Sequence, residues 1–251
     1  MPTQHLDITT PDGVANAYFT RPDGSGPVPG VLLYSDALGL RPSLEQLADR
    51  VAAAGYAVLA PNVYYRESPD PVGHLPRPVD LSRWSELAGL LGPLMQSMDN
   101  TAVLRDAEAY LGFLAASPDV AEGPAGVTGY CMGTRLALRA AEAFPERVAA
   151  VGAFHGGGLA TDAPDSPHLG LGTVRAEVYL GHADHDPGMP PEQVARLDAA
   201  LDEAGITHRT EVYPDAPHGY AMADTTAFRE DAAERHLAEL VALLARTLAR
   251  D

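Results

Sequence analysis

Cys131 is the only cysteine in the chain, and it lies in the pentapeptide Gly-Tyr-Cys-Met-Gly at residues 129–133. A nucleophile flanked at this spacing by glycines is typical of a tight strand-to-helix turn, because glycine lets the backbone pinch without side-chain clashes. The turn exposes the central side chain at a helix N-terminus, where the partial positive charge favours a thiolate. It also places the Met132 N–H to bind an oxyanion. A buried structural cysteine is the alternative, but the pentapeptide favours a nucleophile.

A cysteine nucleophile needs a base and a group that orients the base, and two later segments offer both. Gly-His-Ala-Asp-His-Asp-Pro spans residues 181–187, and Asp-Ala-Pro-His-Gly-Tyr spans residues 215–220. Each segment follows an apolar run that we predict to be a strand. Both are therefore expected at the carboxyl edge of one sheet, beside Cys131. The order of nucleophile, acid and histidine along the chain is that of α/β-hydrolases.

The His and Asp residues at positions 182–186 also permit a different interpretation, as ligands of zinc or iron. The run has no His-x-His pair and no evident distant third ligand, so we expect no metal. No Gly-x-Gly-x-x-Gly follows a predicted strand, which argues against a dinucleotide. No Gly-x-Ser-x-Gly occurs, which argues against an ordinary serine esterase. We expect no cofactor.

The rest of the chain predicts how these segments are held. Apolar runs alternate with helical periodicity, which indicates one α/β domain over residues 1–251, with a mostly parallel sheet and helices on both faces. An opening hairpin is expected around Pro11-Asp12-Gly13. Further strands are predicted at residues 31–34, 56–60, 126–130, 148–154, 176–181 and 207–213. Helices are predicted after Ser43 and at residues 99–115, 132–144, 191–204 and 226–249. The proline-rich residues 66–80 are expected to form a loop.

Composition narrows the possible partners. The chain has 34 acidic residues and 17 basic ones, a net charge of −17, so we expect neither nucleic acid nor an anionic membrane to bind. Every basic residue is arginine, which excludes lysine Schiff-base chemistry. One cysteine, no signal-like N-terminus and no long apolar run predict a cytoplasmic protein. A small-molecule substrate is the expected partner.

Taken together, the three motifs and the Gly-Tyr-Ala-Val-Leu-Ala-Pro run at residues 55–61 resemble the dienelactone hydrolase family of α/β-hydrolases. The resemblance covers roughly residues 28–245. It implies a triad of Cys131, His218 and Asp184, the aspartate being chosen because it lies three residues after a glycine, and it makes Asp186 the weaker candidate. It further implies that Ala37 supplies the second oxyanion N–H.

Two positions depart from the family pattern. Asp36 stands where family members that process dienelactone carry a glutamate that interacts with the resting thiol, so we expect Asp36 to tune the thiol. Met222 stands where the family has an arginine for the substrate carboxylate, which favours an uncharged acyl group. Arg77 and Arg83 are the candidates for supplying a charge instead. Tyr220 and Met222 complete the predicted substrate-binding residues.

These observations predict a hydrolase of the dienelactone hydrolase type, similar to carboxymethylenebutenolidase. It would cleave a lactone or small ester through an acyl-cysteine intermediate, with water activated by His218. One alternative is a promiscuous carboxylesterase that takes neutral substrates. The other is a catalytically silent α/β-hydrolase that serves as a binding module.

Overall fold

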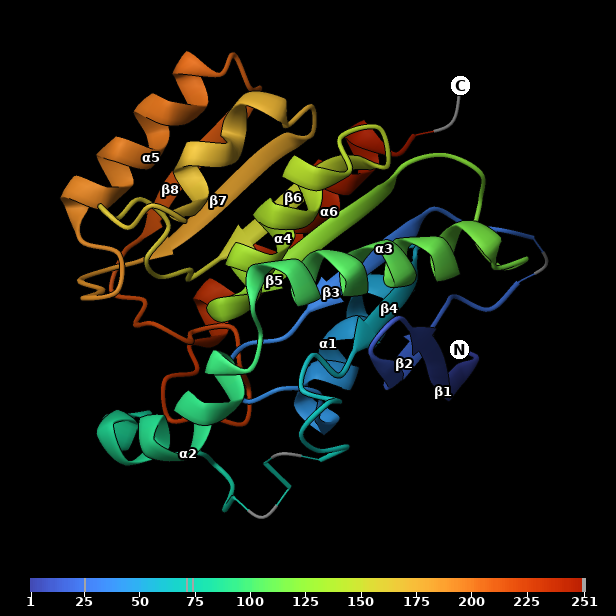
Figure 1. The fold of residues 1–251 in the computed structure, drawn as a ribbon, viewed down its shortest axis with the longest axis horizontal. Helices are drawn as coiled ribbons and strands as arrows, with labels where there is room; N and C mark the ends of the chain where they lie inside the picture. Colours follow the sequence, from blue (N-terminus) through green and yellow to red (C-terminus); the bar gives the residue numbers. More distant parts are fainter. Residues whose placement is uncertain (25, 71, 74, 250–251) are drawn as a thin grey trace.

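A computed structural model describes residues 1–24, 26–70, 72–73 and 75–249 (Figure 1). Eight strands form one sheet in the order β1-β2-β4-β3-β5-β6-β7-β8. Their bounds are β1 Thr3–Thr10, β2 Gly13–Thr20, β3 Gly30–Tyr34, β4 Ala57–Pro61, β5 Ala125–Tyr130, β6 Val148–Phe154, β7 Glu177–Ala183 and β8 His208–Tyr213. Only the two pairings that involve β2 are antiparallel, and those from β4 through β8 are parallel. This is the predicted α/β-hydrolase architecture with its opening hairpin.

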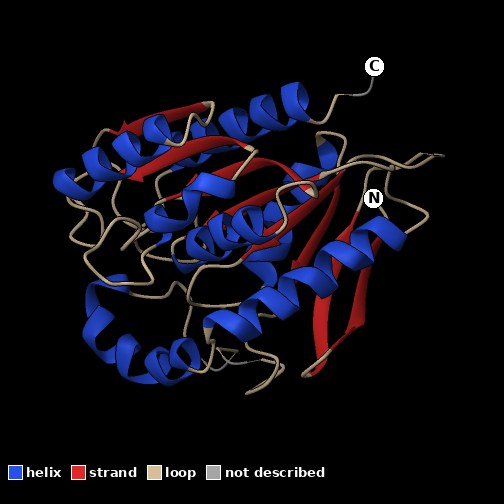
Figure 2. Ribbon diagram, turned by 45° about the horizontal axis from the view of Figure 1, so that its top comes forward, coloured by secondary structure: helices blue, strands red, loops and turns tan. Residues whose placement is uncertain are grey.

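The described part of the chain forms six α-helices around the sheet, and Figure 2 shows helices on both of its faces. Their bounds are α1 Pro42–Ala53, α2 Trp84–Gln96, α3 Asn100–Ala116, α4 Met132–Ala143, α5 Pro191–Glu203 and α6 Glu230–Thr247. Apolar side chains of α3, α4 and α5 pack with one face of the sheet, and those of α1 and α6 pack with the other. Both faces of the central strands are therefore buried, as expected for a parallel sheet. None of the described helices is both long and apolar enough to cross a bilayer.

Helix α2 is the one α-helix that the sequence pattern did not predict. It contains Gly89, Gly92 and Pro93, residues that disfavour helix interiors, and Leu91 is its only fully buried side chain. Leu91 packs in a small cluster with Ala37 and Leu38, residues of the loop that follows β3. The helix thus covers the carboxyl end of the sheet instead of packing on a sheet face. In Figure 1 it lies apart from the other helices, at the lower left.

Candidate active site

Cys131 lies at the turn between β5 and α4, in a backbone conformation that residues other than glycine rarely adopt (φ 52°, ψ −113°). Two close approaches make this turn possible. A Cβ on Gly129 would lie 2.1 Å from the Gly133 carbonyl oxygen, and a Cβ on Gly133 would lie 2.5 Å from the Ser35 carbonyl oxygen. Both positions therefore require glycine. The Cys131 side chain is partly exposed and faces the cavity described below, as predicted for a nucleophile.

His218 follows β8, and its imidazole is held by a carboxylate. His218 Nδ1 donates to Asp186 Oδ2 at 2.6 Å, and that aspartate side chain is almost fully buried. Burial of the imidazole alone would lower its pKa. The opposing effects of the Cys131 charge and of hydrogen bonds to Asp186 and Cys131 outweigh it and raise the His218 pKa to about 11. The surroundings of His218 therefore favour a protonated imidazole that is bonded to the Asp186 carboxylate on one side and faces Cys131 on the other.

The prediction that Asp184 orients the histidine is wrong. Asp184 Oδ2 accepts from the Asp215 N–H at 3.0 Å, and the Asp184 N–H donates to the Ala216 carbonyl at 2.7 Å. Asp184 thus ties the loop after β7 to the loop after β8. His185 then adopts a left-handed backbone (φ 51°), and the turn brings Asp186 to the imidazole. The residue that faces His218 therefore depends on the shape of this turn, which a count from Gly181 does not capture.

The two predicted oxyanion donors both line the cavity beside Cys131. Met132 is the first residue of α4, so its N–H has no acceptor within the helix. Ala37 lies in the loop after β3, two residues beyond Ser35, whose carbonyl oxygen approaches Gly133. The Tyr64 hydroxyl donates to the Ala37 carbonyl at 3.1 Å and contacts the Met132 sulfur at 3.3 Å. Tyr64 therefore bridges the two segments whose N–H groups would bind an oxyanion.

Asp36 precedes Ala37 and belongs to a buried ionic network. Both carboxylate oxygens accept from Arg41, at 2.6 and 3.0 Å, and Oδ1 also accepts from the Leu38 N–H. Arg41 makes a second two-point contact with Asp224, at 2.9 and 3.0 Å. Arg77 adds a further ion pair to Asp224 at 2.8 Å. The charge of Asp36 is thus offset by Arg41, and its effect on the thiol stays a prediction.

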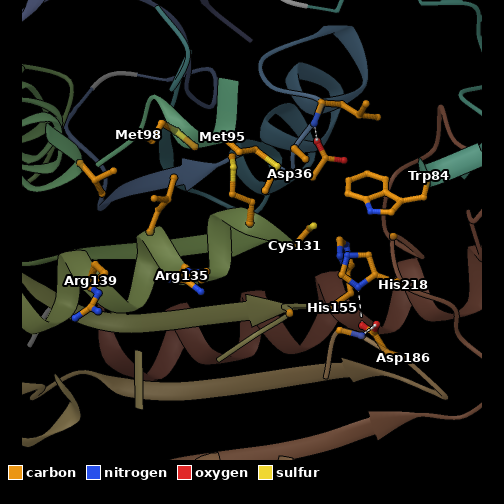
Figure 3. A pocket seen from close by; sticks show the side chains of 18 of the residues that line it. Asp36, Trp84, Met95, Met98, Cys131, Arg135, Arg139, His155, Asp186 and His218 are labelled. Carbon is orange, nitrogen blue, oxygen red and sulfur yellow. Dashed lines mark hydrogen bonds and ion pairs between the residues drawn. The ribbon is translucent and has the colours of Figure 1, made fainter. Parts of the chain in front are cut away.

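A cavity of about 1060 Å³ opens in front of Cys131 (Figure 3). Helix α2 and the turns at either end of it form an apolar wall, to which Trp84, Met95 and Met98 contribute. Residues of α4 form the opposite wall. His218 and Asp186 lie at one end in Figure 3, and Arg135 and Arg139 follow Cys131 toward the other. The site is therefore an elongated cleft with the candidate nucleophile part-way along it.

The model of the dienelactone hydrolase family matches residues 15–248. The chain belongs to the dienelactone hydrolase family. It is 24% identical over 237 residues to a Synechocystis sp. protein named "Putative carboxymethylenebutenolidase", covering 93% of this chain and 89% of the relative. It is 25% identical over 238 residues to the carboxymethylenebutenolidase of Pseudomonas putida, covering 93% and 92%. A crystal structure from Klebsiella pneumoniae, titled a "Putative Dienelactone Hydrolase", has a TM-score of 0.85 at 23% identity and covers 98% of both chains.

None of the four predicted substrate-binding residues of this dienelactone hydrolase family member lines the cavity. Arg77 is bound to Asp224, and Arg83 pairs with Glu86 on an exposed surface. Tyr220 is fully buried, and its hydroxyl donates to the Gly181 carbonyl at 3.0 Å. Met222 is buried in the core between the sheet and α6. All four side chains therefore lie outside the cavity, and their role in substrate binding stays a prediction.

His155 lies closer to the reaction centre than its loop position suggested. It follows β6 with a left-handed backbone (φ 39°) and is fully buried. Its ring packs edge-on against His218, at a centroid distance of 5.3 Å, and against Tyr220 at 4.9 Å. Burial, followed by the neighbouring charge of His218, holds the His155 pKa well below 6.5. A neutral ring thus supports the imidazole of His218 from behind.

Sequence reasoning also missed Arg135, the arginine that lines the cavity one turn beyond Cys131. The signal was present, since residues four apart lie on the same face of a helix. The sequence of α2 contains no comparable pattern that would have predicted its place on the cavity wall. Leu91 is the one fully buried side chain of α2, so no helical stripe of buried residues marks this helix.

Proposed function

We propose that this chain is a cysteine-dependent hydrolase of lactones or small esters, with Cys131 as nucleophile, His218 as acid and base, and Asp186 as the group that orients the imidazole. The observation that carries the proposal is the His218 imidazole, which is bonded to Asp186 and whose pKa the Cys131 charge helps to raise to about 11. An ordinary cysteine thiol is mostly protonated at neutral pH, and a neighbouring imidazolium supplies the charge that favours the thiolate. Family membership supports a hydrolase.

The first step would be attack of the Cys131 thiolate on the substrate carbonyl. The carbon–sulfur bond forms, and the N–H groups of Met132 and Ala37 stabilise the negative oxygen. The ester oxygen then leaves as the alcohol, taking the proton from the His218 imidazolium, and an acyl-cysteine remains. Asp186 keeps Nε2 of His218 directed at the sulfur through its bond to Nδ1.

The second step would be hydrolysis of the acyl-cysteine. Neutral His218 takes a proton from water, the resulting hydroxide attacks the acyl carbon, and the carbon–sulfur bond breaks. The carboxylic acid leaves and gives up its proton at neutral pH. The thiolate and the imidazolium are restored. One water is consumed for each ester bond, and no cofactor enters the balance.

Activity on a panel of 4-nitrophenyl esters and lactones, with and without iodoacetamide, tests the proposal. We expect turnover of at least some members, complete loss on alkylation of Cys131, and a drop in kcat of at least roughly 1000-fold in Cys131→Ala with folding unchanged. A brief denaturing quench during turnover should trap one acyl group per chain, which mass spectrometry detects on Cys131. Activity that survives alkylation would overturn the cysteine mechanism. Inactivity on every substrate would favour the silent binding module.

The apolar wall favours a broad range of ester substrates as a second candidate activity. Met95, Met98 and Trp84 face the cleft, and methionine side chains adapt to differently shaped acyl groups. A carboxylesterase would use the same triad and differ only in substrate range. We also propose a cytoplasmic location, which a single partly exposed cysteine suits.

A further inference from the structure

Cys131 divides the cleft into two arms with different linings. On one side of it lie Met95 and Met98, and on the other lie Trp84 and His218 (Figure 3). We call the first side the inner arm, and its lining includes Met95, Met98, Val103 and Leu136. We call the second side the outer arm, and its lining includes Leu81, Trp84, His218 and Gly219. An ester whose carbonyl lies at Cys131 therefore extends one part into each arm.

The inner arm is apolar and continuous with the core. Val103 and Leu136 are only 8% and 7% exposed, and both belong to the large hydrophobic cluster that α3 and α4 form with the sheet. Met95, Met98 and Cys131 pack against the same cluster. Methylene groups placed here lose contact with water, which is favourable in proportion to the apolar area removed. The inner arm is therefore suited to bind an apolar chain.

The two arginines that border the inner arm have acceptors within the protein. Arg139 donates to Glu142 and to the Asp165 carbonyl, and Arg135 Nη1 donates to the Gly158 carbonyl at 3.3 Å. Both arginines lie on the α4 side of the cleft in Figure 3, and the methionines lie on the α2 side. A chain in the inner arm thus has a wall of thioether and methylene groups along one side.

The outer arm is more open to solvent. Trp84 is 43% exposed, and the His218 side chain is 32% exposed. A Cβ on Gly219 would lie 2.9 Å from Leu81 Cδ1, which places Leu81 beside the loop of His218. A group that lies in this arm keeps much of its contact with water. Its chain length should therefore change binding little.

His218 decides which part of the ester enters which arm. In the proposed mechanism its imidazolium gives a proton to the ester oxygen as the alcohol leaves, so the alcohol has to lie on the His218 side of the sulfur. The bond to Asp186 fixes the imidazole on this side. The acyl carbon is bonded to Cys131 in the intermediate, and its chain extends away from His218. That direction leads into the inner arm.

We propose that the inner arm is the acyl-binding subsite, so that the preferred substrate is an ester with an extended apolar acyl group and a small alcohol. The inference rests on the proposed hydrolase function and names its substrate class. Met95 and Met98 are specificity-determining residues in this proposal, because their unbranched side chains follow the shape of the acyl chain. Contacts with the chain persist in the transition state for attack by Cys131, so they raise kcat/KM.

Two isomeric esters of the same composition test this proposal. Ethyl hexanoate has the long chain on the acyl side, hexyl acetate has it on the alcohol side, and ethyl acetate is the reference. Titration of the released acid at constant pH gives kcat/KM for each ester. We expect wild type to prefer ethyl hexanoate over hexyl acetate by tenfold or more, and to hydrolyse hexyl acetate and ethyl acetate with kcat/KM values within about threefold of each other.

Variants of the inner arm locate the preference. Met95→Asp and Met98→Asp each place a carboxylate there, which a bound acyl chain would desolvate, so each should lower the ratio of kcat/KM for ethyl hexanoate to that for hexyl acetate by fivefold or more. Leu90→Asp is the matched control. Leu90 lies on α2 like Met95, is 40% exposed and lies outside the described lining of the cleft, so its variant should keep the wild-type ratio. Because each ratio compares two substrates of one preparation, partial unfolding does not change it.

The outcomes separate this inference from the proposed function. A wild-type ratio near or below one, or a ratio that both methionine variants leave unchanged, would overturn the acyl subsite while leaving the hydrolase intact. Inactivity of wild type on all three esters would instead count against the proposed function itself, and with it this inference.

Discussion

Asp186 and Asp184 lie two residues apart on the same turn, yet their surroundings assign them different tasks. Asp186 is buried against the imidazole, whereas Asp184 accepts a backbone N–H from the next loop. We expect Asp186→Asn to lower kcat at least roughly 100-fold, because the amide no longer holds the His218 tautomer and no longer stabilises its charge. Steady-state kinetics on one ester measure this effect.

Asp184→Asn is the matched control, since it makes the same chemical change two residues away. It should alter kcat by less than about threefold, because its oxygen still accepts the Asp215 N–H. If Asp184→Asn were the damaging change and Asp186→Asn the silent one, the carboxylate bound to His218 would not be the catalytic one.

For individual residues, the sequence predicted which residue types lie at the site better than it predicted which side chains contact one another. Cys131 and His218 follow from a motif at a strand end, where the parallel sheet fixes their position. The contact of Asp186 with His218 depends on the left-handed turn at His185. Arg77 lies outside the cavity because it forms an ion pair with Asp224. Both outcomes depend on loop conformations and on contacts between residues far apart in the chain, which spacing does not encode.

The turn between β5 and α4 depends on its close approach to the end of β3. Gly133→Ala would place a Cβ 2.5 Å from the Ser35 carbonyl oxygen, and neither backbone segment can move without displacing Cys131 or Ala37. We expect a loss of about 2–3 kcal/mol in the free energy of unfolding, together with at least a tenfold loss of kcat. Urea unfolding and ester kinetics measure the two effects.

Gly112→Ala, within α3, is the control for this glycine substitution. Its Cβ would meet nothing closer than the Arg147 guanidinium at 3.9 Å. Alanine is the better helix former, so the variant should gain up to about 1 kcal/mol and keep wild-type kcat. Equal losses in both variants would show that the close approach to Ser35 does not set the requirement for glycine.

Arg41 joins the loop after β3 to the segment that follows His218. It is almost fully buried and binds Asp36 and Asp224 at once. Arg41→Ala would leave two carboxylates without their main cation, which we expect to cost about 3–5 kcal/mol of unfolding free energy. Arg50→Ala, which breaks the exposed pair with Glu234, should cost less than about 1 kcal/mol. Urea midpoints that shift equally would show that burial does not strengthen the Arg41 network.

Periodicity predicted the elements whose apolar residues face a common core. The eight strands and five of the six α-helices agree with the predicted segments to within a few residues. Helix α2 is the exception because its one fully buried side chain, Leu91, packs with the loop that carries Ala37 and Leu38 and not on a face of the sheet. Gly89, Gly92 and Pro93 have weak helix propensity, so tertiary contacts must stabilise this helix. An element that forms around a site is therefore harder to predict than one that packs on the sheet.

Within the described residues, three histidines are buried and carry no charge in the folded state: His155, His182 and His236. Burial is the main cause in each case. It lowers the pKa of His182 to about 4 and that of His236 to about 3, and it holds that of His155 well below 6.5. In the unfolded chain all three would titrate near pH 6.5. Between pH 6.5 and about 4 the unfolded state therefore binds more protons than the folded state.

Because the unfolded state takes up the extra protons, the stability that these three neutral histidines contribute is fully present above pH 6.5 and is lost as the pH falls. Three additional protons correspond to a slope of up to about 4 kcal/mol per pH unit near pH 5. Urea unfolding at several pH values measures this slope. His236→Phe preserves an aromatic ring against Phe154 and should reduce the slope by about one third. A slope near zero in wild type would mean that these buried histidines can be protonated without unfolding of the protein.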